Sequence, residues 1–124
     1  MKITGTVTRI DDYKRMIVQI DEPTYKKLQA AGIESWTFEK EEKTRYYCKV
    51  YLDRYQKAQI KKYEAFEHKE VDITCLRDSY TLKANERYPQ ARTVQTIVLK
   101  SIRRTAEQII FDECADKAEK ELFE

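Results

Sequence analysis

The sequence predicts a β-rich α+β domain with five strands and a helix between the third and the fourth strand. Five segments alternate apolar or β-branched residues with polar ones, which is the pattern of strands with one buried side. A segment with apolar residues at helical spacing follows the third of these strands. The chain has 124 residues, 41% of them hydrophobic and 11% aromatic, which suits a single domain with one modest core.

The first two strands are predicted at residues 2–10 and 15–20, and the polar turn 11–14 joins them into a hairpin. An extra short helix follows, because Pro23 suits a first helical turn and Leu28 and Ala31 give an apolar side. Gly32 suits the C′ position of this helix, where the backbone takes a left-handed conformation.

Residues 33–44 contain Trp36 and Phe38, followed by the charged run 39–43, and this run is predicted to form a solvated loop. The third strand is predicted at residues 44–53. The alternation places on one side of this strand Tyr46, Cys48, Val50 and Leu52, and on the other Tyr47, Lys49 and Tyr51.

Asp53 and Gln56 match the spacing of a capping box at the start of the next helix, which carries apolar residues at helical spacing up to Phe66. Strands four and five are predicted at residues 70–76 and 93–102, and the polar stretch 83–92 between them reads as a loop. Apart from the extra helix, the element order is β-β-β-α-β-β. This is the order of the OB-fold, a five-stranded Greek-key barrel with its helix between strands three and four.

The charges are divided unevenly along the chain. Residues 1–104 hold 22 Lys and Arg against 15 Asp and Glu, whereas residues 105–124 hold two Lys against seven Asp and Glu. A basic body with an acidic tail is a cue for nucleic-acid binding. We therefore divide the chain into an OB-like nucleic-acid-binding domain, residues 1–104, and an acidic C-terminal helix or tail, residues 105–124.

The acidic segment, residues 105–124, can be interpreted in more than one way. Thr105 could cap a final helix whose acids merely face water. The apolar side of such a helix would consist of Phe111, Ala115, Ala118 and Leu122. Residues 109–111 could instead extend the sheet, because a short apolar run does not decide between helix and strand.

The inventory of reactive residues predicts a protein that is not an enzyme and holds no cofactor or metal. Gly5 and Gly32 are the only glycines, which excludes the glycine-rich loops that bind phosphates or dinucleotides. His68, the single histidine, lies among charged neighbours at a predicted helix end. Asp53 and Asp72 could approach each other as metal ligands, but one is placed as a helix cap and the other on the solvent side of a strand.

Cys48, Cys75 and Cys114 lie far apart in the sequence and form no CxxC motif, so they predict free thiols rather than disulfides or zinc ligands. No apolar run exceeds four residues, which predicts neither a membrane span nor a signal peptide. These observations favour a cytoplasmic protein.

Two groups of basic and aromatic residues are candidates for nucleic-acid binding, in which cations contact phosphates and rings stack on bases. The first group lies on one side of the third strand and comprises Arg45, Tyr47, Lys49 and Tyr51. The second spans the connection between the last two strands and comprises Arg77, Tyr80, Lys83, Arg87, Tyr88 and Arg92. The alternatives are tyrosine rings covered by neighbouring helices and a solvated hairpin with ordinary surface charge.

The strand order, the basic and aromatic third strand and the acidic C-terminus resemble OB-fold single-stranded DNA-binding proteins, in particular the small ones of phages and mobile elements. The segments from Tyr46 to Val50 and from Ile97 to Lys100 carry this resemblance. It implies non-specific binding of single strands, homo-oligomers, and an acidic tail that recruits replication or recombination partners. The tail here differs in having Phe123 as its penultimate residue without a preceding proline.

The competing interpretation is a small protein-interaction module, such as an inhibitor or adaptor encoded by a phage or plasmid. Tyr and Arg are both enriched at protein interfaces, so a surface dense in these residues serves that role as well. Readout of double-stranded DNA is not expected, because no segment forms a strongly basic recognition helix.

Overall fold

The computed structural model describes residues 1–87 and 89–123 and contains one six-stranded antiparallel sheet with the strand order β3-β4-β2-β1-β5-β6. The strands are β1 (Lys2–Ile10), β2 (Met16–Ile20), β3 (Ser35–Lys40), β4 (Lys43–Val50), β5 (Glu70–Leu82) and β6 (Arg92–Arg104). The helices are α1 (Glu22–Ala30), α2 (Arg54–Ala58), α3 (Ile60–Glu64) and α4 (Ala106–Phe123). The predicted β-rich α+β class is confirmed, but the predicted number of five strands is wrong.

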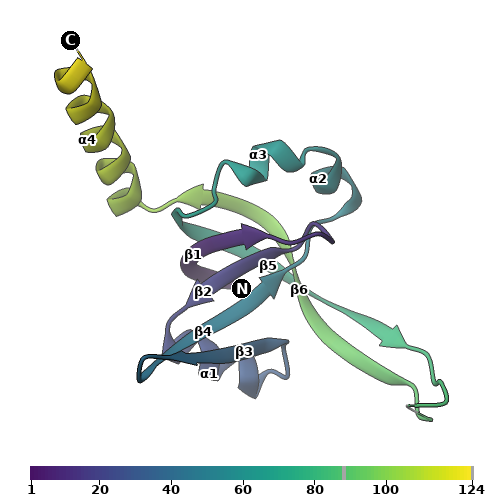
Figure 1. Cartoon of the computed structure of the whole chain (residues 1–124). Helices are drawn as coiled ribbons and strands as arrows, with labels where there is room; N and C mark the ends of the chain where they lie inside the picture. The colour runs from purple at the N-terminus through teal and green to yellow at the C-terminus, as the bar shows by residue number, and fades with distance from the viewer. Residues whose placement is uncertain (88, 124) are drawn as a thin grey trace.

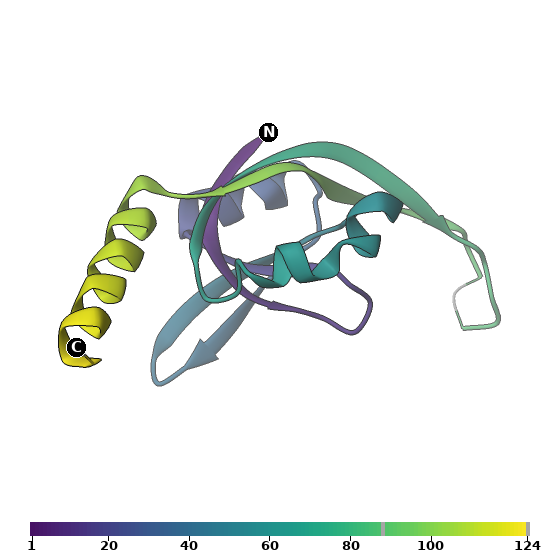
Figure 2. The ribbon, with the colours of Figure 1, turned by 90° about the horizontal axis from the view of Figure 1, so that it is seen from above.

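The sheet curls into a partly closed barrel (Figures 1 and 2). Within it, β5, β1, β2 and β4 lie side by side in the spatial order of a Greek key. The barrel closes just beyond β4, where the Tyr51 amide donates to the Ile97 carbonyl at 2.9 Å and the Leu99 amide donates to the Tyr51 carbonyl at 2.9 Å. This contact is parallel, in contrast to the antiparallel pairs of the sheet.

The interior of the barrel is filled by side chains from all strands except β3. Val7, Val18, Val50, Val71 and Ile97 have no exposed surface. The inward side of β4 carries Cys48 and Val50, as the alternation predicted, and burial raises the pKa of the Cys48 thiol to about 12. This thiol is therefore protonated and unreactive at neutral pH.

β1 is bent and pairs with two strands at once. Residues 2–6 pair with β5, and residues 6–10 pair with β2, so that Thr6 has a partner on each side. A Cβ atom on Gly5 would lie 2.4 Å from the Gln19 carbonyl oxygen and 2.8 Å from a methyl group of Val18. Only glycine therefore fits at this position without displacing β2.

The helix signals in the sequence correspond to the observed helix ends. The Gly32 amide donates to the Gln29 carbonyl and the Ile33 amide to the Leu28 carbonyl, which is the Schellman pattern, and Gly32 has φ of +70°. Asp53 and Gln56 form both hydrogen bonds of a capping box at the start of α2. The predicted single helix after the third strand is divided at Gln59 into α2 and α3.

The predicted solvated loop at residues 39–43 is wrong, because Glu39 and Lys40 belong to β3 and Lys43 to β4, and these strands pair as a hairpin. The turn between these strands consists of Glu41 and Glu42, which both have positive φ, at 53° and 65°. Positive φ at both central residues defines the type I′ hairpin turn, which usually contains Asn or Gly. The charged run 39–43 therefore contains a tight turn made of residues that are typical of a solvated surface.

The last two strands are longer than the predicted 70–76 and 93–102. They form a hairpin that extends beyond the barrel on the side away from α4 (Figures 1 and 2). The connection begins at residue 83, as predicted, and lies at the tip of this hairpin.

Within the acidic segment 105–124 residues 106–123 form the helix α4, so the alternative of a strand at residues 109–111 is wrong. The Thr105 hydroxyl accepts a hydrogen bond from the Gln108 amide at 3.1 Å, as expected of a cap. Asp112 anchors the first turns through Lys69 at 2.7 Å and Arg104 at 2.7 Å. Beyond this anchor α4 projects away from the barrel (Figure 1), and none of the helices in the described ranges is long and apolar enough to cross a membrane.

Replacing Gly5 by Ala should destabilise the barrel by about 1–3 kcal/mol, the usual cost of forcing an extra methyl group into a packed position. The new methyl group would displace the Gln19 carbonyl from its strand. Urea unfolding monitored by circular dichroism measures this loss. The control Lys2→Ala, at an exposed position in the same strand, should lose much less. Equal stabilities of Gly5→Ala and the wild type would contradict the close approach of β1 to β2.

The anchor of α4 should depend on pH. Hydrogen bonds from Lys69 and Arg104 lower the pKa of Asp112 from 3.8 to about 2, so the folded state favours the ionised carboxylate. A lowered pKa contributes stability that is fully present above the ordinary value of 3.8 and is lost as the pH falls towards 2. The difference in melting temperature between the wild type and Asp112→Asn should therefore be largest at pH 6 and shrink below pH 4. A difference that stays constant across this range would refute the ion-pair anchor.

Candidate nucleic-acid interface

The outward side of β4 and its two neighbours forms a shallow hollow in which aromatic and cationic side chains alternate. Tyr47 pairs across the sheet with Gln19 of β2 and with Trp36 of β3, and Arg45 pairs with Phe38 of β3. The hollow is lined by Thr8, Arg9, Ile17, Gln19, Trp36, Phe38, Arg45 and Tyr47.

Trp36 and Tyr47 form an aromatic platform in this hollow. Their ring centroids are 6.0 Å apart and their planes differ by 18°, so the two rings lie nearly parallel. Both side chains are half-buried, and the neighbouring Phe38 is 54% exposed. Flat, accessible rings of this kind are the surfaces on which unpaired bases stack.

The cations around the platform differ in how far they are already neutralised. Lys49 donates to Glu34 at 3.1 Å and lies 5.4 Å from the centroid of the Trp36 ring. Within residues 1–87 and 89–123, neither Arg9 nor Arg45 forms an ion pair. These two guanidinium groups can therefore bind a phosphate without first breaking an ion pair with a carboxylate.

A second aromatic group lies around Tyr51, where the barrel closes. The Tyr51 ring is 6.4 Å from Tyr80 and 5.9 Å from the Arg15 guanidinium, which also lies 5.0 Å from Tyr13. The Tyr51 hydroxyl donates to Glu34 at 3.0 Å. Burial, followed by this hydrogen bond, raises the pKa of Tyr51. Tyr51 is thus held in place by the protein, whereas Tyr13 and Tyr80 are exposed.

The other predicted site residues lie on the β5–β6 hairpin. Arg77 donates to the Ala31 carbonyl at 2.8 Å, so it binds the end of α1. Lys83, Arg87 and Arg92 lie in or directly beside the connection between β5 and β6. Figure 1 shows this end of the hairpin away from β3 and β4. Tyr88 lies outside the described residues. The structure thus brings Arg45, Tyr47, Lys49, Tyr51 and Tyr80 to the curved face around β4 and places the loop cations at a separate position.

Sequence reasoning did not identify Trp36, Phe38 or Arg9 as site residues. The signal was present for the two aromatic residues, because they are spaced by two in a short segment with strand-forming side chains. The charged run that follows them concealed the strand. Arg9 gave no such signal, since its place in the hollow depends on the pairing of β1 with β2, which brings Arg9 opposite Ile17.

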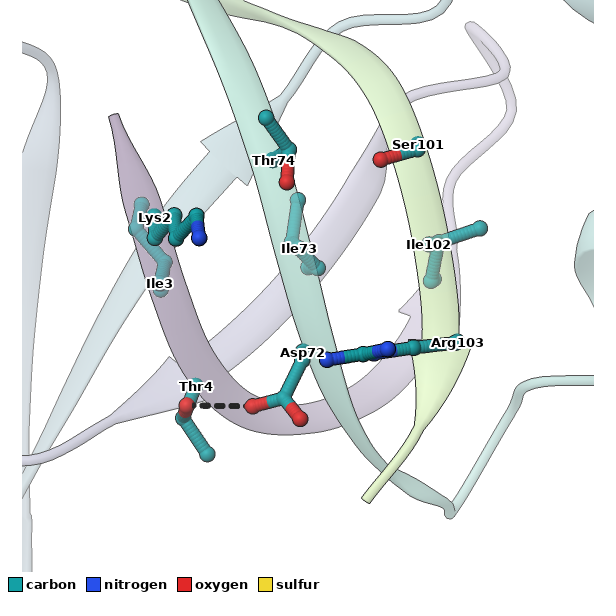
Figure 3. A pocket seen from close by; sticks show the side chains of 9 residues that line it. All are labelled: Lys2, Ile3, Thr4, Asp72, Ile73, Thr74, Ser101, Ile102 and Arg103. Carbon is teal, nitrogen blue, oxygen red and sulfur yellow. Dashed lines mark hydrogen bonds between the residues drawn. The ribbon is translucent and has the colours of Figure 1, made fainter.

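The acidic residues considered as metal ligands have other partners. Asp53 caps α2, and Asp72 accepts a hydrogen bond from Thr4 at 2.7 Å. Figure 3 shows Asp72 in a polar hollow across β1, β5 and β6, with the Arg103 side chain directed towards it from the paired position. In the part of the chain that the structure describes, no group of three or more His, Cys, Asp or Glu residues could hold a metal ion.

Neither a protein-family model nor a curated protein sequence matches this chain. Among solved structures, it is similar to the crystal structure of a small single-stranded DNA-binding protein from Streptomyces coelicolor, with a TM-score of 0.44 and 13% sequence identity. The match covers 86% of this chain and 94% of that one. A likeness at this level assigns neither a fold family nor a function, so the function has to be argued from the residues of the hollow itself.

Proposed function

We propose that this chain binds single-stranded nucleic acid without catalysis, on the outward face of β2, β3 and β4 in an OB-type barrel. The observation that carries the proposal is the Trp36–Tyr47 platform with the guanidinium groups of Arg9 and Arg45 in the same hollow. Stacking of a base on an aromatic ring is worth about 1–3 kcal/mol, and cations beside the ring hold the adjoining phosphates.

The form of the hollow favours a single strand over a duplex. The platform offers ring faces, which a base can cover only when it is not stacked within a helix. The hollow is also shallow and lies on a curved sheet, and all its lining residues belong to strands, so none of the described helices contributes to it as a recognition helix would. DNA is our first choice of strand, in keeping with the OB-type order of elements.

The β5–β6 hairpin would extend the binding surface. Tyr80 on this hairpin already contacts Tyr51, and the tip carries Lys83, Arg87 and Arg92. In this proposal a strand that crosses the platform continues past Tyr80 towards these cations. They would act as phosphate contacts, which bind all sequences alike.

Replacing Trp36 or Tyr47 by Ala should each weaken binding of a single-stranded oligonucleotide by about 1–3 kcal/mol, because each change removes a stacking surface. Fluorescence anisotropy of labelled oligo-dT, oligo-U and a duplex, each titrated at two salt concentrations, measures the effect. Tyr55→Ala is the matched control, since Tyr55 lies on α2 and its side chain is 81% exposed.

Wild-type affinity in both platform variants, with normal thermal melting, would remove this face from the binding site. Absence of binding by the wild type to all three oligonucleotides would reject the proposed function and favour the protein-interaction module.

Replacing Glu34 by Gln should strengthen binding and steepen its salt dependence. The change releases Lys49 from its ion pair, so one more cation can contact a phosphate. The slope of log K against log salt should then grow by about 0.7, the value for one additional phosphate contact on a single strand. Glu22→Gln, which breaks the exposed ion pair with Lys26 on α1, is the control and should leave the slope unchanged. If the slope of Glu34→Gln also equals that of the wild type, Lys49 does not reach the strand.

A further inference from the structure

The projecting helix α4 carries an apolar stripe that the barrel does not cover. Phe111, Ala115, Ala118 and Leu122 follow one another at intervals of four, three and four residues, which places them on one side of the helix. Phe111 is 67% exposed and Leu122 is 80% exposed. Exposed apolar side chains in a continuous row on a helix are typical of an interaction surface.

A groove runs between the start of this stripe and α3. Its apolar lining consists of Ala65 and Phe66, together with Phe111 and Ala115 of α4. Its charged lining includes three cations, Lys62, Lys69 and Arg104, and two acids, Asp112 and Asp116. Asp112 binds both Lys69 and Arg104, so this part of the groove retains an excess of positive charge.

A fitting partner for this groove is a helix with an apolar stripe that is flanked by acids. The C-terminal half of α4 has this composition, because Ala118 and Leu122 lie on the stripe and Glu119 lies beside it, on the same flank as Asp112. We propose that two copies of this chain associate through α4, with the two helices antiparallel and each helix end lying in the groove of the other copy.

The antiparallel direction follows from side-chain size and from charge. A two-fold axis at the middle of the stripe sets Ala115 opposite Ala118 of the second copy and Phe111 opposite its Leu122. The small residues at the centre allow the helices to approach closely, while the large ones fill the two grooves. The same register brings Glu119 of each copy to the cations around Asp112. In a parallel pair, Glu119 of one copy would instead lie beside Glu119 of the other copy, and both grooves would stay empty.

The consequence of this arrangement is a particle with two barrels. In Figure 1 α4 lies at the top of the molecule and β3 at the bottom, so pairing through α4 leaves both hollows around β3 and β4 open. If these hollows bind a strand, as proposed above, the pair can hold two segments of one strand and gains from the high effective concentration of the second site. The association itself does not depend on that function.

Sedimentation velocity of the full chain without nucleic acid tests the association. The expected result is a concentration-dependent dimer between about 1 and 200 µM, the affinity range of a small interface. Phe111→Asp and Leu122→Asp should each raise the dissociation constant at least about tenfold, because each places a charge in the apolar stripe. Ile110→Ser is the matched control, since Ile110 is 60% exposed but lies off the stripe, and it should dimerise like the wild type. A monomer throughout the range, or a dimer that tolerates both Asp variants, would overturn the proposal.

Cross-linking tests the register. Cys114 is exposed while Cys48 and Cys75 are buried, so the Cys114→Ser background leaves no accessible thiol among the native cysteines. Phe111→Cys and Leu122→Cys in this background should form a disulfide-linked dimer when mixed under mild oxidation. Neither should do so alone, because in the antiparallel pair the same position in the two copies is separated by about 16 Å along the helix axis. Cross-linking of each variant with itself would overturn the antiparallel arrangement. Circular dichroism of each variant confirms that α4 remains helical.

Discussion

The barrel depends on β1, because this one strand supplies the hydrogen bonds of both halves of the sheet. Its first residues pair with β5 and its last residues with β2, and the change of partner occurs around Gly5 and Thr6. The strand can bend across β2 at this point only because Gly5 has no side chain. The bend in turn brings Arg9 into the hollow beside β4, and the resulting curvature lets Tyr51 reach β6. The fold and the candidate site therefore both require a residue without a side chain at position 5.

Most of the fold could be predicted from local patterns, and the errors have physical causes. The alternation along residues 44–53 predicted the inward Cys48 and Val50, and the capping residues Gly32, Asp53 and Thr105 predicted where helices end or begin. The strand β3 was missed because its turn uses two glutamates in a conformation that normally requires Asn or Gly. The outer part of β5, residues 77–82, was missed because its side chains are exposed and carry little apolar alternation, whereas β6 was missed only at its ends, Arg92, Arg103 and Arg104.

The candidate site could be predicted only in part. The sequence shows which residues are cationic, but only the fold shows which of them form ion pairs with carboxylates. Lys49 forms an ion pair with Glu34, and Arg15 forms one with Asp11. Arg45 occupies an equivalent place on the same face without such a partner among the described residues, and no local pattern separates it from Lys49. The pairs depend on contacts between β4 and the segment before β3, and on the turn after β1, which the sequence pattern does not specify.

The turn at Glu41 and Glu42 has a consequence for how the protein moves. A residue other than glycine in the left-handed region costs about 1–2 kcal/mol, and here two such residues follow each other. They lie at the end of a hairpin whose outer strand, β3, is the edge strand of the described sheet and pairs with β4 on one side only. This hairpin should therefore open locally at a lower free energy than the shared strand β1, and its amide hydrogens should exchange with solvent sooner. Because Trp36 belongs to β3 and Tyr47 to β4, each such opening takes the aromatic platform apart and each closure rebuilds it, while the barrel stays folded.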